Sequence, residues 1–337
     1  MGHLTFKEEF MKQHPKLVKT SSQRASGRIG SRSLSIAAVL AAGTVLSLGI
    51  GSTTATAGGD PCKTTSLAAA KACVEGAKSD YNLALGKCAN IADPVAQKAC
   101  QAQAKSDLKD ALDTCKAQTA ARLAGCARLG KATYEPSIVA SNFVGTITNS
   151  FMPLIPGTTF TYVSPIESNV VSVTHNTKVI FGVTCVEVHD VVYADGVLTE
   201  DTLDWFAQDK DGNVWYFGEN THELDGNEIT SIDGSFKGGT NGAQPGIIMK
   251  ANPTVGDFYR QEFDLGNAED FAEVISLTNT VIVASGTFTN CLKTLETSPL
   301  EPDAMENKYY ASGVGNVLVI DLATAERLEL ISVTVGP

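Results

Sequence analysis

The chain has 337 residues, 43% of them hydrophobic, and a formal net charge of −11. This composition is typical of a globular protein rather than a disordered one, and the length allows about two domains. The charge is uneven, because residues 132–337 carry 8 basic and 28 acidic side chains, a net charge of −20. Such a segment excludes nucleic acid as a partner and disfavours anionic membrane surfaces, since both are bound through Lys and Arg.

Residues 1–57 are typical of an export signal peptide. A basic, Ser-rich stretch from Lys7 to Arg32 precedes an apolar run from Leu34 to Ile50, and Ala55-Thr56-Ala57 then matches the A-x-A cleavage pattern. We expect cleavage near Ala57-Gly58 and a secreted or periplasmic protein with no membrane span in the mature chain. The alternative is an uncleaved anchor, because about 18 apolar residues can just span a bilayer.

Residues 58–131 contain six of the eight cysteines, at separations of 11, 15, 12, 15 and 11 residues, a series that reads the same in both directions. The segment is rich in the helix formers Ala, Lys, Gln and Leu; Asp93 suits an N-cap, Pro94 a first helical position and Gly130 a stop. Two antiparallel helices would place symmetric cysteines opposite one another, whereas zinc ligands usually come as close C-x2-C pairs. We therefore predict a disulfide-linked helical hairpin with the pairs Cys62–Cys126, Cys73–Cys115 and Cys88–Cys100.

After a linker over residues 132–150, residues 151–337 show short apolar or alternating runs separated by Asp-Gly turn signals. No helical pattern alternates with these runs, so a parallel α/β sheet is disfavoured. We predict an α+β protein in which the hairpin is followed by an acidic, mainly antiparallel β domain forming a curved sheet or open barrel. The predicted strands are Thr158–Val163, Asn169–Thr174, Val183–Tyr193, Leu198–Phe206, Val214–Phe217, Phe258–Phe263, Ala272–Leu277, Val281–Ala284, Leu292–Leu295, Val317–Leu322 and Leu328–Val335.

The β domain holds the last two cysteines, Cys185 and Cys291, each in a predicted strand. An even cysteine count in an oxidising compartment predicts a fourth disulfide, Cys185–Cys291. The alternative is a pair of buried free thiols.

One predicted hairpin carries the aromatic side chains Trp205, Trp215 and Tyr216, which build either the core of the sheet or an aromatic platform for a ligand. In its turn, Asp209, Asp211 and Asn213 alternate like the start of a calcium loop. The Gly and Glu that an EF-hand requires at its sixth and twelfth positions are missing, so the choice is between a calcium site and a simple hairpin.

Several stretches carry a resemblance to known proteins. Residues 151–159 read FMPLIPGTT, residues 204–219 read DWFAQDKDGNVWYFGE, and residues 308–315 read KYYASGVG. With the Cys-rich hairpin, they resemble an uncharacterised family of exported bacterial proteins with a lipoprotein-like antiparallel β-sheet domain. The resemblance implies a curved sheet outside the cytoplasm that binds rather than catalyses.

No G-x-S-x-G elbow, P-loop or complete H-E-x-x-H motif is present, and residues 58–337 contain only the histidines His175, His189 and His222. We therefore expect a binding protein, not an enzyme, for a small apolar or amphipathic molecule or for an envelope or extracellular protein. Calcium is the one cofactor considered. The alternatives are a calcium-stabilised surface or structural protein, and a hydrolase that uses His189 or His222 beside a carboxylate or hydroxyl.

Overall fold

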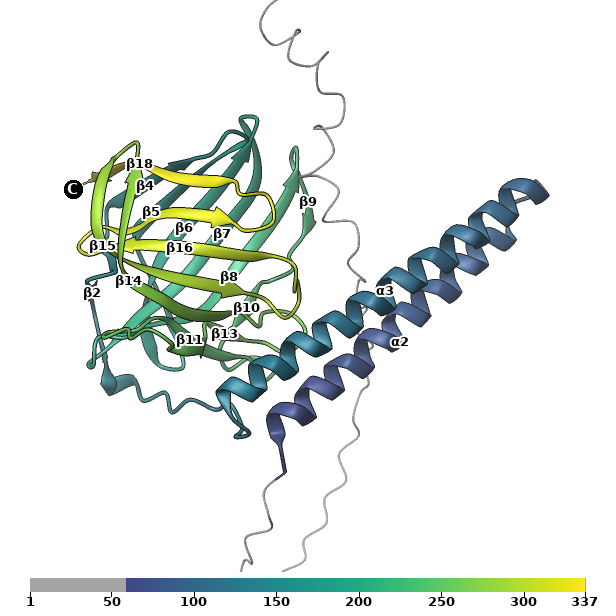
Figure 1. Ribbon diagram of the computed structural model, residues 1–337, viewed down its shortest axis with the longest axis horizontal. Helices are drawn as coiled ribbons and strands as arrows, with labels where there is room; N and C mark the ends of the chain where they lie inside the picture. Colours follow the sequence, from purple (N-terminus) through teal and green to yellow (C-terminus); the bar gives the residue numbers. More distant parts are fainter. Residues whose placement is uncertain (1–58, 337) are drawn as a thin grey trace, which may run out of the picture. The chain divides into compact units, whose positions relative to one another are not determined.

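The computed structural model describes residues 59–336, and the predicted signal peptide lies outside them. These residues divide into two compact units, one formed by residues 71–115 and the other by residues 59–70 and 116–336. The first unit is the turn-containing end of a helical hairpin, and the second combines the other end of the hairpin with all of the strands (Figure 1). Among the described helices, none combines the length and the apolar content needed to cross a bilayer.

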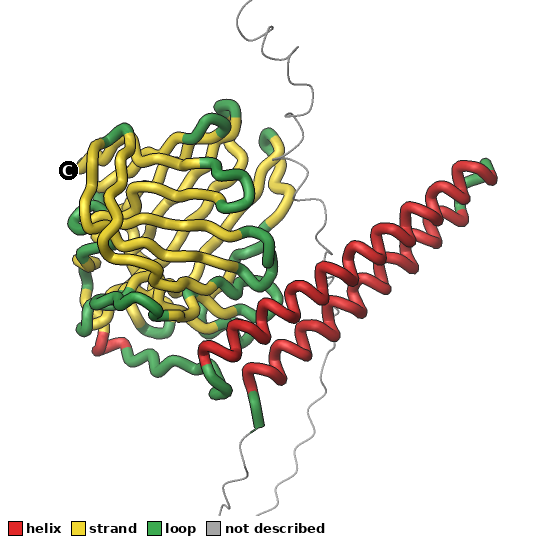
Figure 2. The backbone as a smooth tube through the Cα atoms, in the orientation of Figure 1, coloured by secondary structure: helices red, strands yellow, loops and turns green. Residues whose placement is uncertain are grey.

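Two long helices, α2 (Pro61–Ala89) and α3 (Pro94–Leu129), form the predicted antiparallel hairpin (Figure 2). Each begins with Pro at its first position, and the preceding Asp60 or Asp93 accepts hydrogen bonds from backbone N–H groups of the first turn. The second helix stops at Gly130, whose φ of 92° is readily adopted only by glycine. The local sequence therefore sets both starts and the final stop.

All three predicted hairpin disulfides are present: Cys62–Cys126, Cys73–Cys115 and Cys88–Cys100, with Cα–Cα distances of 5.5 to 5.7 Å. Buried Ala77 and Ala104 help the helices to approach this closely, because alanine takes little room. Two helices with so few large apolar side chains bury little surface. Each disulfide is expected to stabilise by about 2–4 kcal/mol, and the hairpin depends on them.

The β domain is built on one antiparallel sheet of 16 strands, which confirms the predicted fold class. In spatial order its main path runs β12-β14-β15-β16-β17-β18-β4-β5-β6-β7-β8-β11-β13, and β2 and β3 form a separate pair. The strands are β1 (Phe143–Val144), β2 (Ile147–Asn149), β3 (Met152–Leu154), β4 (Thr158–Val163), β5 (Glu167–Ile180), β6 (Val183–Ala194), β7 (Val197–Asp209), β8 (Val214–Asp225), β9 (Glu228–Ser231), β10 (Phe236–Lys237), β11 (Gln244–Met249), β12 (Phe258–Arg260), β13 (Glu262–Phe263), β14 (Phe271–Val283), β15 (Gly286–Thr297), β16 (Met305–Ala311), β17 (Gly315–Asp321) and β18 (Arg327–Val335).

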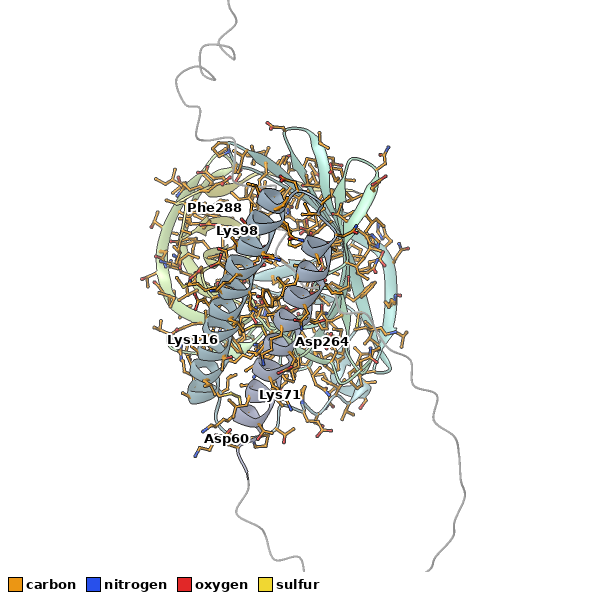
Figure 3. The ribbon with its side chains drawn as sticks, turned by 90° about the vertical axis from the view of Figure 1, so that its right-hand side faces the viewer. Asp60, Lys71, Lys98, Lys116, Asp264 and Phe288 are labelled. Atoms are coloured by element: carbon orange, nitrogen blue, oxygen red, sulfur yellow. A yellow bond between two sulfur atoms is a disulfide. The ribbon has the colours of Figure 1, made fainter. Side chains whose placement is uncertain are left out.

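A short stretch of chain closes this sheet on itself. Its two end strands, β12 and β13, are separated in sequence only by Gln261. Arg260 pairs with Phe271 of β14, whereas Glu262 pairs with Pro245 of β11. The chain thus leaves one edge of the sheet and joins the other within three residues, which makes the sheet a nearly closed barrel. Figure 3 shows the strands curving round, with side chains on both faces.

The closure requires a glycine at position 246, in β11. A Cβ atom at Gly246 would lie 2.3 Å from the carbonyl carbon of Gln261 and 2.4 Å from its oxygen. Both are backbone atoms, which cannot swing aside as the tip of a side chain can. The two ends of the sheet can therefore meet only where no side chain stands between them.

Alternation along the strands produces two separate hydrophobic clusters. The inner cluster includes Phe160, Val188, Leu292 and Leu330. The outer cluster consists of Ile180, Val183, Cys185, Trp205, Ala207 and Phe217.

The predicted disulfide Cys185–Cys291 is wrong, because both residues are buried free thiols. Cys185 belongs to the outer cluster and Cys291 to the inner one. Their strands, β6 and β15, are not neighbours in the sheet. The even number of cysteines therefore predicts a pairing that the alternation of the strands prevents, because the two thiols lie in different clusters.

Several strand assignments differ from the sequence prediction. Phe258–Phe263, expected as one strand, is divided into β12 and β13 at Gln261, and β3, β9, β10 and β11 were not predicted. Residues 132–150, expected as a linker, contain β1 and β2, and β1 pairs with β7. Ala272–Leu277 and Val281–Ala284, expected as two strands, fall largely within the single strand β14, whose register shifts mark the interruption. The strand β16 was not predicted, because three consecutive polar residues near its start, Glu306-Asn307-Lys308, interrupt the alternation of apolar and polar side chains.

A buried ion pair joins α3 to the loop before β14 within the second unit. Arg122 Nε and Nη2 donate to both carboxylate oxygens of Glu269 at 2.7 to 3.0 Å, and the two side chains are 4% and 2% exposed. The backbone N–H of Gly266 donates to the same carboxylate at 2.8 Å. One helical turn further, Gly125 leaves room for the ring of Phe271, which would lie 2.7 Å from a Cβ there.

Removing one partner of this pair should be worse than removing both. Glu269→Leu leaves the Arg122 guanidinium buried without a counter-charge, and we expect a loss of about 3–5 kcal/mol in the free energy of unfolding. The double variant Arg122→Met/Glu269→Leu should recover at least half of that loss. Urea unfolding measures both, and a double variant as unstable as the single one would contradict the prediction.

The closure of the sheet is tested at its glycine. Gly246→Ala should lower the free energy of unfolding by about 1–3 kcal/mol or more, because the new methyl group meets backbone atoms. Gly145→Ala is the matched control, since nothing lies within 4 Å of a Cβ at that position. Its stability should stay within about 0.5 kcal/mol of the wild type. Equal effects of the two substitutions in urea unfolding would refute the steric argument.

Candidate functional site

The inward-facing side chains of the barrel leave a cavity of about 450 Å³. Part of its wall is apolar and includes Phe160, Val171, Val188, Phe206 and Leu328. The rest is polar and consists largely of Tyr162, Asn169, Asp190, Asp204, Tyr216, Glu219, Gln261, Glu262, Asp270, Glu296, Glu306, Lys308, Tyr310 and Asn316.

Of the described side chains that line this cavity, Lys308 on β16 is the single basic one. Its Nζ lies 2.9 Å from Glu296 Oε2 and 3.7 Å from Glu306 Oε2. Glu296 Oε1 also accepts hydrogen bonds from Thr294 Oγ1 and Tyr310 Oη, each at 3.0 Å. Burial alone would raise the pKa of Glu296, but the charge of Lys308 and these hydrogen bonds lower it. Glu296 is therefore ionised and compensates the charge of Lys308.

Other carboxyl groups in the cavity have no such partner. Within residues 59–336, Asp190, Asp204 and Glu219 form no ion pair. Burial, reinforced by neighbouring carboxylates that include Glu200, raises the pKa of Asp190 and of Asp204 to about 8 and that of Glu219 to about 7. The distant charge of Lys308 lowers the pKa of both aspartates only in part. These groups therefore hold protons near neutral pH when the cavity contains no other cation.

Glu262 and Asp270 extend this group to the seam of the barrel. Burial raises the pKa of Asp270 to about 6 and that of Glu262 well above its usual range. The charges of Asp270, Glu219 and Asp204 raise the pKa of Glu262 further. The acidic lining thus extends from β6 across β7 and β8 to β13.

The contacts of Tyr216 require a proton on one of the neighbouring carboxyl groups. Its Oη lies within hydrogen-bond distance of Asp204 Oδ1 and 2.9 Å from Glu219 Oε2. A phenol has one hydrogen to donate, so it can satisfy only one of two carboxylates. The second contact requires a proton on Asp204 or Glu219, in agreement with the raised pKa of both groups.

Four side chains of the lining each have a buried polar atom without a hydrogen-bond partner in the described structure. The atoms are Asn169 Oδ1, Asp190 Oδ1, Gln261 Nε2 and Asn316 Nδ2. Gln261, the residue at the seam, is only 3% exposed. An unsatisfied buried polar group costs about 1–3 kcal/mol, so native proteins rarely keep one without a compensating role. The cavity therefore offers an occupant the acceptor Asn169 Oδ1, the donors Gln261 Nε2 and Asn316 Nδ2, and the titratable carboxyl group of Asp190.

A second hollow, of about 470 Å³, is lined in part by Lys178, Trp205 and Lys237. Lys178 Nζ lies 4.1 Å from the centre of the Trp205 ring, and Trp205 Nε1 donates to Glu187 at 3.3 Å. None of the described side chains that line this hollow has a buried polar atom without a partner. We therefore take the acidic cavity inside the barrel as the candidate site.

The three aromatic side chains predicted as a ligand platform do not lie on one face of the sheet. Trp205 lies in the outer cluster, and Trp215 packs beside it with its Nε1 donating to Asp209 Oδ2 at 2.8 Å. Tyr216 points inward, stacks on Phe206 with ring centroids 4.7 Å apart, and lines the acidic cavity. The interpretation as core fits the two tryptophans, and Tyr216 alone reaches the site.

In the turn predicted as a possible calcium site, the carboxylate oxygens of Asp209 accept hydrogen bonds from neighbouring residues. Asp209 Oδ1 accepts the backbone N–H of Asn213 at 2.8 Å, and Asp209 Oδ2 accepts Asn213 Nδ2 at 2.9 Å as well as Trp215 Nε1. Asp211 is exposed. Among residues 59–336 no group of three His, Cys, Asp or Glu side chains is placed to hold a metal ion. The geometry is that of a hairpin turn stabilised by Asp209.

The histidines lie away from the cavity lining. His189 Nε2 is 2.9 Å from Asp201 Oδ1, and both side chains are about two-fifths exposed on the outer face. His222 sits opposite Asp201 in the register of β7 and β8. His175 does not line the cavity either.

The sequence carries one signal for the acidic cavity. Asp190 lies two residues after inward-facing Val188, and Asp204 lies two residues before inward-facing Phe206. Because residues two apart on a strand face the same side, both carboxyl groups point into the barrel. By their charge alone, the neighbouring acidic residues Glu200, Asp201 and Asp204 are expected to form a solvated face. That interpretation holds for Asp201 and fails for Asp204, which is 9% exposed.

Comparisons with known proteins leave the function open. No family model matches the chain, and no curated protein matches it. The crystal structure of a candidate lipoprotein from Parabacteroides distasonis is similar over 55% of this chain and 99% of that one, at 13% sequence identity and a TM-score of 0.32. So weak a likeness carries no argument about function.

The buried carboxyl groups should make stability fall as pH rises. Folded Asp204 keeps its proton up to a pKa of about 8, whereas the unfolded carboxyl loses it near pH ~4. Unfolding between these values releases a proton, so the free energy of unfolding should drop by up to about 1.4 kcal/mol per pH unit for each such group. Asp204→Asn should flatten this slope and stabilise the protein at about pH 7.5.

The matched control is Asp211→Asn, which removes an exposed carboxylate in the turn between β7 and β8 and should keep the wild-type slope. Urea unfolding between about pH 5 and pH 8 measures all three proteins. A wild type whose stability is independent of pH in this range, or an Asp204→Asn slope equal to that of the wild type, would contradict the assignment.

Proposed function

We propose that the protein is an exported, non-enzymatic binding protein that holds a small amphipathic molecule inside its barrel. The single observation that carries this proposal is the cavity, whose wall combines apolar side chains with buried polar atoms that have no partner. Ligand sites are typically concave, mostly apolar and equipped with a few polar groups that orient the ligand.

The size of the cavity supports an occupant of modest dimensions. Its volume of about 450 Å³ falls within the range of about 300–1,000 Å³ that is usual for ligand pockets. At ~30 Å³ for each molecule in liquid water, the same space would hold about 15 waters. A single aromatic or short aliphatic molecule would fill it, with its apolar part against Phe160 and Phe206 and its polar part toward Gln261 and Asp190.

The location outside the cytoplasm is part of the proposal. Three disulfides join the hairpin, and disulfides persist mainly in oxidising compartments. The apolar run and A-x-A pattern of residues 34–57 and the resemblance to exported lipoprotein-like domains support the same location.

A neutral apolar fluorophore tests the binding function directly. N-phenyl-1-naphthylamine, which brightens in apolar surroundings, should bind the protein with one-to-one stoichiometry. Val171→Trp should weaken that binding at least about tenfold, because the indole fills space beside Phe160. Val170→Trp, one residue earlier and on the other face of β5, is the control and should bind like the wild type.

Circular dichroism confirms that both variants are folded. The proposal fails if the wild type does not brighten the fluorophore, or if Val171→Trp binds it as well as Val170→Trp does.

A further inference from the structure

The charges that line the cavity do not balance. Of the described side chains, seven carboxyl groups face the cavity, and the one amine among them is that of Lys308, which Glu296 and Glu306 compensate. Asp190, Asp204 and Glu219 lie on the neighbouring strands β6, β7 and β8. Asp204 is the register partner of Glu219, and Asp190 pairs with Thr202, two residues along the strand from Asp204. This wall lacks a positive charge.

In the absence of a cation, a proton on one of these carboxyl groups reduces the negative charge of the wall. Tyr216 contacts both Asp204 and Glu219 with a single hydrogen, so one of the two carboxyl groups must supply another. Asp190 Oδ1, on the adjacent strand, is buried and accepts no hydrogen bond in the described structure. An ammonium group would bring one positive charge and up to three N–H donors to this wall.

A second observation is independent of the acidic wall. Gln261 is 97% buried at the seam of the barrel, lines the cavity, and has no partner for Nε2 in the described structure. Its amide is a hydrogen-bond donor that needs an acceptor, and the carboxyl groups nearby do not take that role. The occupant should therefore carry an oxygen acceptor in addition to its positive charge.

We propose that the ligand is a small amphipathic organic amine, bound with its ammonium group at Asp190, Asp204 and Glu219 and its apolar body against Phe160 and Phe206. This inference rests on the proposed function, because it names the chemical class of the molecule in the same cavity. It adds that the ligand is positively charged, which the volume of the cavity and its apolar wall do not specify.

A divalent cation fits the same wall less well. Calcium takes about 6–8 oxygen ligands in one shell, and no three acidic, His or Cys side chains of residues 59–336 are grouped for that purpose. Oxygens of Asp204 and Glu219 are already shared with the Tyr216 hydroxyl. An N–H donor can join such a shared hydrogen-bond arrangement, whereas a metal ion would have to displace it.

Three matched probes separate charge from shape. Tyramine, tyrosol and 3-(4-hydroxyphenyl)propanoate share a hydroxyphenyl body and end in an ammonium, a hydroxyl and a carboxylate. Isothermal titration calorimetry on the full mature chain at about pH 7.5 should show tyramine binding at least about tenfold more tightly than tyrosol, with no binding of the propanoate. Octylamine, octanol and octanoate repeat the comparison of charge with an aliphatic body. Octylamine carries no oxygen acceptor for Gln261 and should therefore bind less tightly than tyramine.

Proton release gives a readout that packing alone would not produce. Because the ammonium replaces a proton held by the carboxyl groups, amine binding should release protons, seen as a dependence of the heat on the ionisation enthalpy of the buffer. Affinity for the amine should rise between about pH 5 and pH 8, since Asp204 and Glu219 give up their protons over this range.

Matched variants locate the effect. Asp204→Asn/Glu219→Gln should weaken amine binding at least about tenfold and leave tyrosol and N-phenyl-1-naphthylamine unchanged. Asp201→Asn, on the outer face of β7, should bind the amines like the wild type. If the double variant does not fold, Asp190→Asn serves as the second test with the same expectation.

The outcomes distinguish this inference from the proposed function. Binding of N-phenyl-1-naphthylamine, with tyrosol and octanol equal to their amines or with neither amine bound, overturns the amine and leaves the binding function. Failure of every probe overturns both. Displacement of tyramine by millimolar CaCl₂ overturns the amine in favour of a metal site.

Discussion

The β domain depends on the place where its sheet closes. Gln261 is the single residue between β12 and β13, and Gly246 provides the space for the two ends to meet. Closure turns one face of the strands along the main path of the sheet into an interior, whatever side chains that face carries. The apolar ones form the core, and the acidic ones on β6, β7 and β8 are taken out of water with them. The high pKa of Asp204, the shared proton at Tyr216 and the cavity all follow from that topology.

Local signals made the hairpin predictable, because its determinants lie close to the elements they shape. The symmetric cysteine spacing identified three disulfides, and Asp93, Pro94 and Gly130 set helix ends. The strand Thr158–Val163 was predicted with its observed bounds, since its alternation is uninterrupted. The barrel was harder to predict, because pairing of β12 with β14 and of β13 with β11 joins distant segments. Because closure is not evident from the sequence, the charge of Asp204 predicts a solvated carboxylate. The strand that carries Lys308 starts with polar residues and so lacks a recognisable alternation.

The formal charge of residues 132–337 overstates the charge that the folded domain carries. Asp190, Asp204 and Glu219 keep protons to pKa values of about 8, 8 and 7, and Glu262 is held neutral by deeper burial. The acidic composition therefore has two parts. One covers the outer surface and favours solubility. The other lies inside, where a carboxylate can stay ionised only if a cation compensates its charge.

The two free thiols have a consequence for the biogenesis of the chain. A protein with three disulfides and two reduced cysteines must direct its oxidation, because any exposed thiol can exchange with a neighbouring disulfide. All six hairpin cysteines precede Cys185 in the sequence. On the proposed export route, which starts from the N-terminus, the hairpin can complete its pairing before the later thiols emerge. Cys185 and Cys291 are then 0% exposed in the folded sheet. Closing the barrel therefore also ends the period during which mispaired chains can form.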